Sequence, residues 1–276
     1  ETKKLYFLTG HGETEFSSSI TNLMQKSGVE AEELNLLITG QIAEDCDMLV
    51  LNGPTSDITK KEKKLLDQYI KQGGNVLVLM SEKGPESGNL ADLLSAYRIT
   101  MEKGYIADME RSYQGNYYSI LPNVTAAEEK LTDGLDTGMV LMANSRGFTL
   151  GESSEEITVS SILETSSNGY AVTDDEEQQG TYAIGARASY TAESQNAEEE
   201  DADAVTGTLT VYGSDSMLNE MITGLFSGLD NETLFMNSIS SVFDDMDNLS
   251  IEAKSMSVQY NAVQYGGYIS VILIFV

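Results

Sequence analysis

Three short glycine-containing turns hold the residues that are best suited to binding a ligand. They are the segments 10–13 (Gly-His-Gly-Glu), 52–54 (Asn-Gly-Pro) and 213–215 (Gly-Ser-Asp). Glycine lets a ligand approach the backbone closely, and the first turn of a helix presents free amide donors. The candidate ligand-binding residues are Gly10, His11, Gly12, Glu13, Asn52, Gly53, Ser81, Ser214 and Asp215. The alternative is that these residues only build strand-to-helix turns, which need glycine and Ser or Asp caps in any protein.

Catalysis by the same turns has weaker support. His11 and Glu13 could act as an acid–base pair, and Ser81 with His11 could form a nucleophilic dyad. However, the chain contains no Gly-x-Ser-x-Gly motif of a serine nucleophile. The first turn also lacks the third glycine of a dinucleotide-binding motif and the Lys-Ser or Lys-Thr of a phosphate-binding loop. We therefore predict no catalytic residue, and a hydrolase using His11, Glu13 and Ser81 is the alternative.

The counts of metal-binding residues argue against a metal centre. The chain has one histidine, His11, and one cysteine, Cys46, so multi-histidine and cysteine-rich frameworks are excluded. The acidic segment 193–204 could bind calcium, but it lacks the fixed oxygen spacing and turn glycine of a calcium loop. A solvated hairpin loop is the favoured interpretation of that segment. We expect no metal and no cofactor.

The net charge restricts the classes of partner. There are 44 acidic and 16 basic residues, which leave a formal charge of -28 at pH 7. Long-range repulsion opposes binding to a phosphate backbone, so we expect no nucleic acid partner. The same field keeps the chain away from an anionic bilayer unless something anchors it. This acidity is typical of a soluble, exposed domain.

The elements that must position the three turns follow a repeated pattern of apolar strand, polar turn and amphipathic helix. Apolar strands are predicted at 4–8, 48–51 and 75–80, with helices at 14–27 and 60–72. A third strand-turn-helix unit follows Tyr212. Strands that are apolar on both faces and alternate with helices predict an α/β fold with a mainly parallel sheet. The three turns are then expected at one edge of that sheet.

The remaining signals predict further elements with less regular patterns. Segments 181–191 and 205–212 alternate as paired antiparallel strands do, and 99–106 is predicted to be one outer strand. A helix beginning at 213–216 is expected to bury the stripe Met217, Leu218, Met221, Ile222, Leu225 and Phe226. Tyrosines at 113, 117 and 118 indicate a lid or a surface excursion in the polar stretch that contains them.

The domain organisation is expected to be simple. No boundary rich in proline or serine divides the chain, so residues 1–265 are predicted to form a single elaborated domain. Residues 266–276 are an apolar segment with two interpretations, a final buried strand or the first turns of a membrane helix. No signal peptide is visible after Glu1, and we expect that the chain is a piece cut from a longer protein.

Several segments in order along the chain resemble the GldG-like auxiliary proteins of ABC transporters, known from gliding-motility systems. The segments are 8–13, 47–54, 57–62, 69–79, 104–108, 163–166 and 211–216. The resemblance implies an extracytoplasmic domain in the cell membrane, with flanking membrane helices and with ABC permease and ATPase subunits as partners. It also implies a three-layer sandwich of the flavodoxin and glutamine-amidotransferase-like kind, with an additional antiparallel portion. The chain departs from active amidotransferases because it lacks their cysteine and their downstream His-Glu pair.

The sequence therefore predicts a non-catalytic auxiliary domain of an ABC-type transport system, which works by binding. A partner subunit, a glycan or a small molecule remain alternatives for the bound species. A degenerate amidotransferase-like hydrolase and a structural spacer without a ligand are the competing hypotheses.

Overall fold

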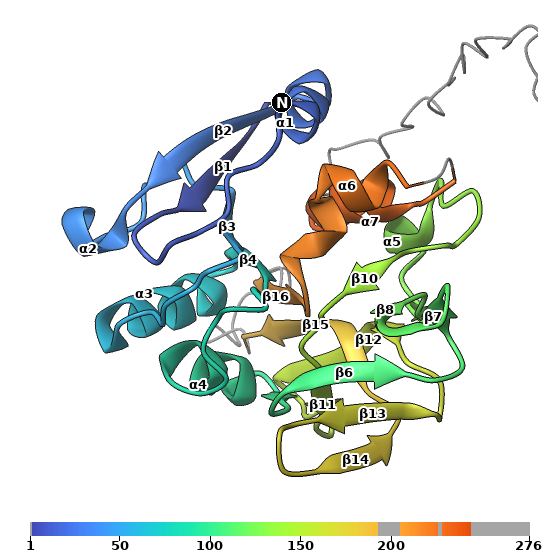
Figure 1. Ribbon diagram of the computed structural model, residues 1–276. Helices are drawn as coiled ribbons and strands as arrows, with labels where there is room; N and C mark the ends of the chain where they lie inside the picture. Colours follow the sequence, from blue (N-terminus) through green and yellow to red (C-terminus); the bar gives the residue numbers. More distant parts are fainter. Residues whose placement is uncertain (1, 193–204, 226–227, 244–276) are drawn as a thin grey trace, which may run out of the picture.

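A computed structural model of the protein describes residues 2–192, 205–225 and 228–243 (Figure 1). Its main sheet has the order β2-β1-β3-β4-β16-β15-β11-β5, and β12 and β9 extend it beside β15. The five strands from β2 to β16 are parallel. Their bounds are β1 (Lys3–Leu8), β2 (Val29–Leu34), β3 (Met48–Asn52), β4 (Asn75–Leu79) and β16 (Thr206–Tyr212). The predicted α/β class with a mainly parallel sheet is thus confirmed.

The antiparallel portion begins where β15 pairs with β16. The two strands are antiparallel, as the alternation in the sequence predicts, and Gly185 lies opposite Tyr212. The other antiparallel strands of the main sheet are β5 (Ile99–Met101), β9 (Asn123–Val124), β11 (Phe148–Leu150), β12 (Ile157–Glu164) and β15 (Ala183–Thr191). Two small sheets complete the described fold: β10 (Met142–Ala143) with β8 (Asn116–Ile120) and β7 (Ser112–Tyr113), and β14 (Glu177–Gly180) with β13 (Gly169–Val172) and β6 (Tyr105–Asp108).

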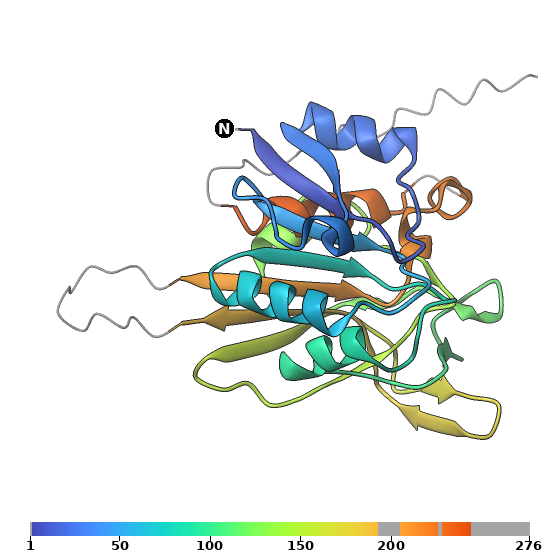
Figure 2. The ribbon, with the colours of Figure 1, turned by 90° about the vertical axis from the view of Figure 1, so that its left-hand side faces the viewer.

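The parallel strands are apolar on both faces because helices cover both. Successive side chains of a strand point to opposite faces. Leu49 and Leu51 of β3 pack with α3 (Lys60–Lys71) and α4 (Asn89–Ala96), on the side that faces the viewer in Figure 2. Met48 and Val50 pack with α1 (Ser18–Lys26) and α7 (Asn231–Ser240) on the other face. Three layers result. Two short helices, α2 (Leu36–Thr39) and α5 (Glu129–Thr132), follow β2 and β9 in the chain.

Helix α3 shows how local sequence signals place these layers. Thr59 accepts from the backbone N–H of Glu62, and the Glu62 carboxylate accepts from the backbone N–H of Thr59 at 2.8 Å. This capping box fixes the first turn of the helix. Leu66 and Ile70 are buried on its inner side, and Gly73 follows with a φ of 93°. The predicted helix and both of its ends are confirmed.

The prediction of one continuous helix after β16 is wrong. The chain forms a 3₁₀ turn at Asp215–Leu218 and then a separate short helix, α6 (Glu220–Thr223). Asn219 adopts an extended conformation between them, and its side chain accepts from the N–H of Met221. A side chain that bonds its own backbone in this way competes with helix continuation. The predicted stripe is therefore not buried throughout, because Met221 is 78% exposed.

Other boundaries also differ from the sequence expectation. The segment 99–106 is two strands, β5 and β6, in different sheets, because the chain turns at Gly104 with a φ of 74°. The first helix begins after its N-cap Ser17 rather than at Thr14, so residues 14–17 are a loop. The tyrosines at 113, 117 and 118 lie on the β7–β8 hairpin, where Tyr117 is 45% exposed.

Two predictions concern segments outside the described residues. They are the acidic loop 193–204 and the apolar segment 266–276. The extent of the domain stays a prediction. Within the part of the chain that the structure describes, no helix has the length and apolar character needed to cross a membrane.

Substitution of Leu51 by alanine tests the core beneath α3 and α4. Leu51 is fully buried, so Leu51→Ala is expected to lower the free energy of unfolding by about 3 kcal/mol. Leu37→Ala is the matched control, because Leu37 is 52% exposed and its loss is expected to cost no more than about 0.5 kcal/mol. Urea denaturation followed by circular dichroism measures both changes. Equal losses in the two variants would contradict the described core.

Candidate functional site

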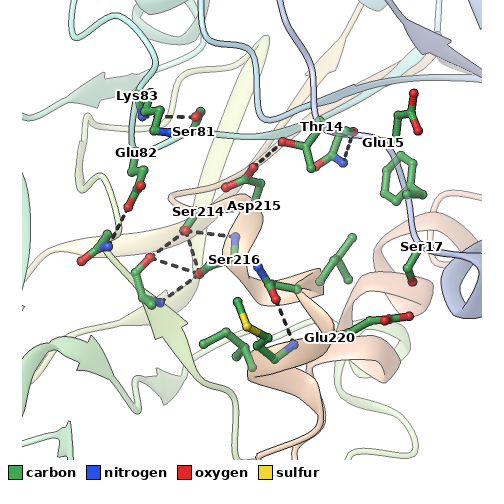
Figure 3. A pocket seen from close by; sticks show the side chains of 18 of the residues that line it. Thr14, Glu15, Ser17, Ser81, Glu82, Lys83, Ser214, Asp215, Ser216 and Glu220 are labelled. Atoms are coloured by element: carbon green, nitrogen blue, oxygen red, sulfur yellow. Dashed lines mark hydrogen bonds between the residues drawn. The ribbon is translucent and has the colours of Figure 1, made fainter.

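A cavity of about 700 Å³ lies at the edge of the sheet where the parallel strands end (Figure 3). Its lining comes from the segments that follow β1, β3, β4 and β16, together with residues around β10. Ligands of open parallel sheets bind at this edge, because helix starts and loops meet there. The residues that line it include Thr14, Glu15, Phe16, Asn52, Ser81, Glu82, Lys83, Asn144, Ser214, Asp215, Ser216, Leu218, Glu220 and Met221.

Four of the predicted residues line this cavity: Asn52, Ser81, Ser214 and Asp215. Thr14 connects Asn52 with Asp215, and its bond to Asp215 is drawn in Figure 3. Its hydroxyl donates to Asp215 Oδ2 at 2.8 Å, and its carbonyl oxygen accepts from Asn52 Nδ2 at 2.7 Å. Residues 201 positions apart in the chain therefore share one hydrogen-bonded group.

Sequence reasoning missed Thr14 as a site residue because it placed this threonine inside a helix. The available signal was Ser17, which has the side chain of an N-cap and forms that cap here. A helix beginning after Ser17 leaves Thr14, Glu15 and Phe16 in a loop that crosses the ends of the strands, where they line the cavity.

Gly53 is not among the lining residues, but its small size makes the site geometry possible. Its φ is 62°, and a Cβ atom there would overlap the carboxylate of Asp215. The absence of a side chain thus lets Asp215 approach the turn after β3. The backbone N–H of Asp215 donates to the carbonyl oxygen of Met80 at 2.7 Å, which fixes the β16 turn against the end of β4.

The hydroxyl groups of the two predicted serines, Ser81 and Ser214, form hydrogen bonds that stabilise their own turns. Ser214 donates to the carbonyl oxygen of Ala143 at 2.7 Å and accepts from the backbone N–H of Ser216 at 3.1 Å. Ser81 accepts from the backbone N–H of Lys83 at 3.2 Å. For these hydroxyls the interpretation as turn-building residues has direct support.

Four predicted residues, Gly10, His11, Gly12 and Glu13, form a separate cluster that does not line the cavity. The His11 ring is 3% exposed, with Nδ1 at 2.7 Å from Glu13 Oε1 and Nε2 at 3.1 Å from Glu62 Oε1. The backbone carbonyl oxygen of His11 accepts from the backbone N–H groups of Thr55 and Ser56. His11 therefore ties the first turn to the start of α3, and its described side-chain partners do not include Ser81.

Burial affects the titration of Asp215, which is partly buried in the cavity wall. Desolvation raises the pKa of its carboxyl group; the hydrogen bond from Thr14 opposes this rise, and the charge of Glu82 adds to it. The net pKa is raised. Three further carboxylates line the cavity, those of Glu15, Glu82 and Glu220, against one basic side chain, Lys83, among the residues described there.

Arg146 holds the loop that carries Ser81, Glu82 and Lys83. Its guanidinium is buried and donates to the carbonyl oxygens of Glu82 and Gly84 at 2.8 and 3.1 Å. Asn144 donates to the Glu82 carboxylate at 2.6 Å. The wall formed after β4 is thus fixed by the loop between β10 and β11.

Comparison with protein families defines the class of this protein. Residues 2–216 match the family ABC_transp_aux, described as an ABC-type uncharacterized transport system. The match spans most of the chain, and the protein belongs to this family of ABC transporter auxiliary components. The resemblance seen in the sequence is confirmed at this level, while the narrower GldG-like assignment stays a prediction. Among curated proteins, none matches the chain significantly.

Solved structures with the same fold are distant in sequence. The mmIFT52 N-terminal domain has a TM-score of 0.59 at 15% identity and covers 88% of this chain and 99% of its own. A ThuA-like protein from Bacteroides uniformis has a TM-score of 0.53 at 14% identity, covering 89% of this chain and 93% of its own. PurLQS from Thermotoga maritima is also similar, with a TM-score of 0.41 at 12% identity and coverages of 88% and 100%. The first two show a shared fold only.

The His11 cluster should make stability depend on pH. Burial lowers the pKa of His11, but the hydrogen bond to Glu13 and the charge of Glu62 outweigh it, so the net pKa is raised. A raised histidine pKa stabilises the fold fully below the unfolded value of about 6.5, and this stabilisation is lost as pH rises through the folded value. His11→Asn should therefore lower the free energy of unfolding by roughly 1 to 3 kcal/mol at about pH 6 and by less at about pH 8.5. Urea denaturation across this pH range measures the difference in free energy of unfolding between the original protein and the variant. A difference that grows as the pH rises would contradict the prediction.

The carboxylate of Asp215 should reduce stability at neutral pH. Its pKa is raised, so the charged form is disfavoured in the folded state, and this penalty disappears as pH falls through the raised value. Asp215→Asn keeps an oxygen that can accept from Thr14 and is expected to raise the free energy of unfolding by about 1 kcal/mol at about pH 7.5. Thermal and urea unfolding check this expectation. The gain in the free energy of unfolding should vanish in acid. An Asp215→Asn variant that is less stable than the original protein at neutral pH would refute the expectation.

Proposed function

We propose that this domain is a non-catalytic binding component of an ABC-type transport system. The cavity at the ends of the parallel strands carries the proposal, because it gathers side chains from four separate segments around one open space. Concave sites with a few convergent polar groups are where proteins bind small ligands. The predicted binding residues Asn52, Ser81, Ser214 and Asp215 belong to this cavity, whereas Gly10, His11, Gly12, Glu13 and Gly53 act by supporting it.

Binding is favoured over catalysis because the groups that could react are engaged elsewhere. A hydrolase would need a base beside Ser81, but His11 is held between Glu13 and Glu62. Burial raises the pKa of the Cys46 thiol to about 11, and Tyr69 donates to its sulfur, so this thiol is a poor nucleophile. A spacer without a ligand is also disfavoured, since it needs no polar cavity.

Membership in the family supports partners in a membrane transporter. We propose that the partners are the permease and the ATPase of an ABC system, and that flanking membrane helices hold this domain on the extracytoplasmic side. The net charge of -28 supports this arrangement, because an acidic domain is repelled by an anionic bilayer and stays in solvent beside it.

Co-purification from native membranes tests the proposal. The full-length protein, solubilised in a mild detergent, is expected to retain an ABC permease and an ABC ATPase, identified by mass spectrometry. The Glu177→Cys variant, changed on the exposed β14, reports the side of the membrane through a membrane-impermeant maleimide, because Cys46 is poorly reactive. Labelling of intact cells at this position is expected.

The same purification contains its own control. Asp215→Asn changes the cavity without removing a core side chain, so it should leave the association with permease and ATPase intact. A full-length protein that is recovered from membranes without either subunit, or that is labelled only after lysis, would contradict the proposed assembly.

A further inference from the structure

The ionisable groups of the cavity wall are mostly acidic, and they come from distant parts of the chain. Glu15 follows β1, Glu82 follows β4, Asp215 follows β16, and Glu220 lies in α6. Lys83 is the one basic side chain among the described lining residues. In a chain with a formal charge of -28, these carboxylates form a local concentration of negative potential in a concave surface. An anionic ligand is therefore disfavoured, and a cation is attracted.

Asn52 adds an observation that is independent of charge. Its side chain is 5% exposed and lines the cavity, and its Nδ2 donates to the carbonyl oxygen of Thr14. A carbonyl oxygen can only accept, so this bond fixes which end of the amide is the nitrogen. The remaining atom, Oδ1, is a buried acceptor without a hydrogen-bond partner. A buried acceptor left unpaired costs free energy, and a donor brought by a ligand would recover it.

Asp215 belongs to the same hydrogen-bonded group as Asn52 and also lines the cavity. Thr14 joins the two residues, since its carbonyl oxygen accepts from Asn52 and its hydroxyl donates to Asp215 Oδ2. Among the described residues, no other residue donates a hydrogen bond to the second carboxylate oxygen, Oδ1, which can therefore accept from a ligand. Asn52 and Asp215, both hydrogen-bonded to Thr14, thus offer an amide oxygen and a carboxylate oxygen to a positively charged group with several N–H donors.

The spread of the carboxylates argues for an organic cation rather than a metal ion. Among the residues that the structure describes, no three His, Cys, Asp or Glu side chains are grouped closely enough to hold a metal. The wall also contains the apolar side chains of Phe16, Leu218 and Met221, and Met221 is 78% exposed at α6. These surfaces would remain uncovered by an inorganic ion but can pack against the methylene groups of an organic one.

We propose that the cavity binds an aliphatic amine, with an ammonium group at Asp215 and Asn52 and its hydrocarbon body against Phe16, Leu218 and Met221. This assignment rests on the proposed function, because it names the ligand class of the same binding site. Lys83 opposes the ligand electrostatically and limits its affinity.

Isothermal titration of the full chain with putrescine and spermidine tests the assignment at about pH 7.5 and low salt. The neutral analogue 1,4-butanediol and Mg²⁺ serve as comparison ligands. We expect saturable binding of at least one of the two amines to one site, with tighter binding than either comparison ligand. Asp215→Asn should weaken this binding about tenfold, and because this variant is expected to stay folded, the loss reports the site. Lys83→Gln should strengthen it about threefold, which misfolding cannot produce.

Glu177→Gln is the matched control, because it removes one negative charge from exposed β14, whose residues do not line the cavity. Equal weakening by Asp215→Asn and Glu177→Gln would show that only the overall charge attracts the amines and would overturn the assignment. Binding of butanediol or Mg²⁺ as tightly as the amines, or no saturable binding of either amine, would overturn it as well. In each of these cases, retention of the permease and ATPase by the full-length protein would leave the proposed function standing.

Discussion

The parallel pairing of β16 with β4 is the contact on which the candidate site depends. Thr208 lies opposite Asn75 in this register, and its hydroxyl donates to Asn75 Oδ1 at 2.8 Å. More than a hundred residues separate the two strands in the chain, so closing this contact orders a long loop of intervening structure. Once it forms, the turn after β16 reaches the same edge as the turns after β1 and β3. The hydrogen bond between Thr14 and Asp215 is a direct consequence of this arrangement.

The second half of the chain is joined to the parallel sheet by two buried arginines. Arg146 donates to Glu86 at 2.7 Å as well as to backbone carbonyls of the loop after β4. Arg187 of β15 donates to Thr210 of β16 and to Glu128, which immediately precedes α5. Each guanidinium donates to more than one segment, so each arginine fixes several segments at once. The cavity wall is consequently formed by a rigid framework and not by the turns alone.

Residue type was a poor guide to the role of the only histidine. A histidine between two glycines and next to a glutamate has the composition of a catalytic turn, yet His11 is enclosed by Glu13 and Glu62. Glu62 is also the residue that closes the capping box of α3. The pair of carboxylates needs a positive partner, and His11 provides it from the neighbouring turn. The histidine thus stabilises the junction of two elements, while Asn52 and Asp215 line the cavity.

Local signals in the sequence determined the elements that depend on neighbouring residues. The apolar runs of β1, β3 and β4 required cover on both faces, and Thr59 with Glu62 defined the start of α3, because strand burial and helix capping are short-range effects. Tertiary structure decided the rest. It placed Thr14 in one hydrogen-bonded group with Asn52 and Asp215, and it brought Glu62 against His11. These features arise from contacts between residues far apart in the chain, whose geometry exists only after the strands have paired.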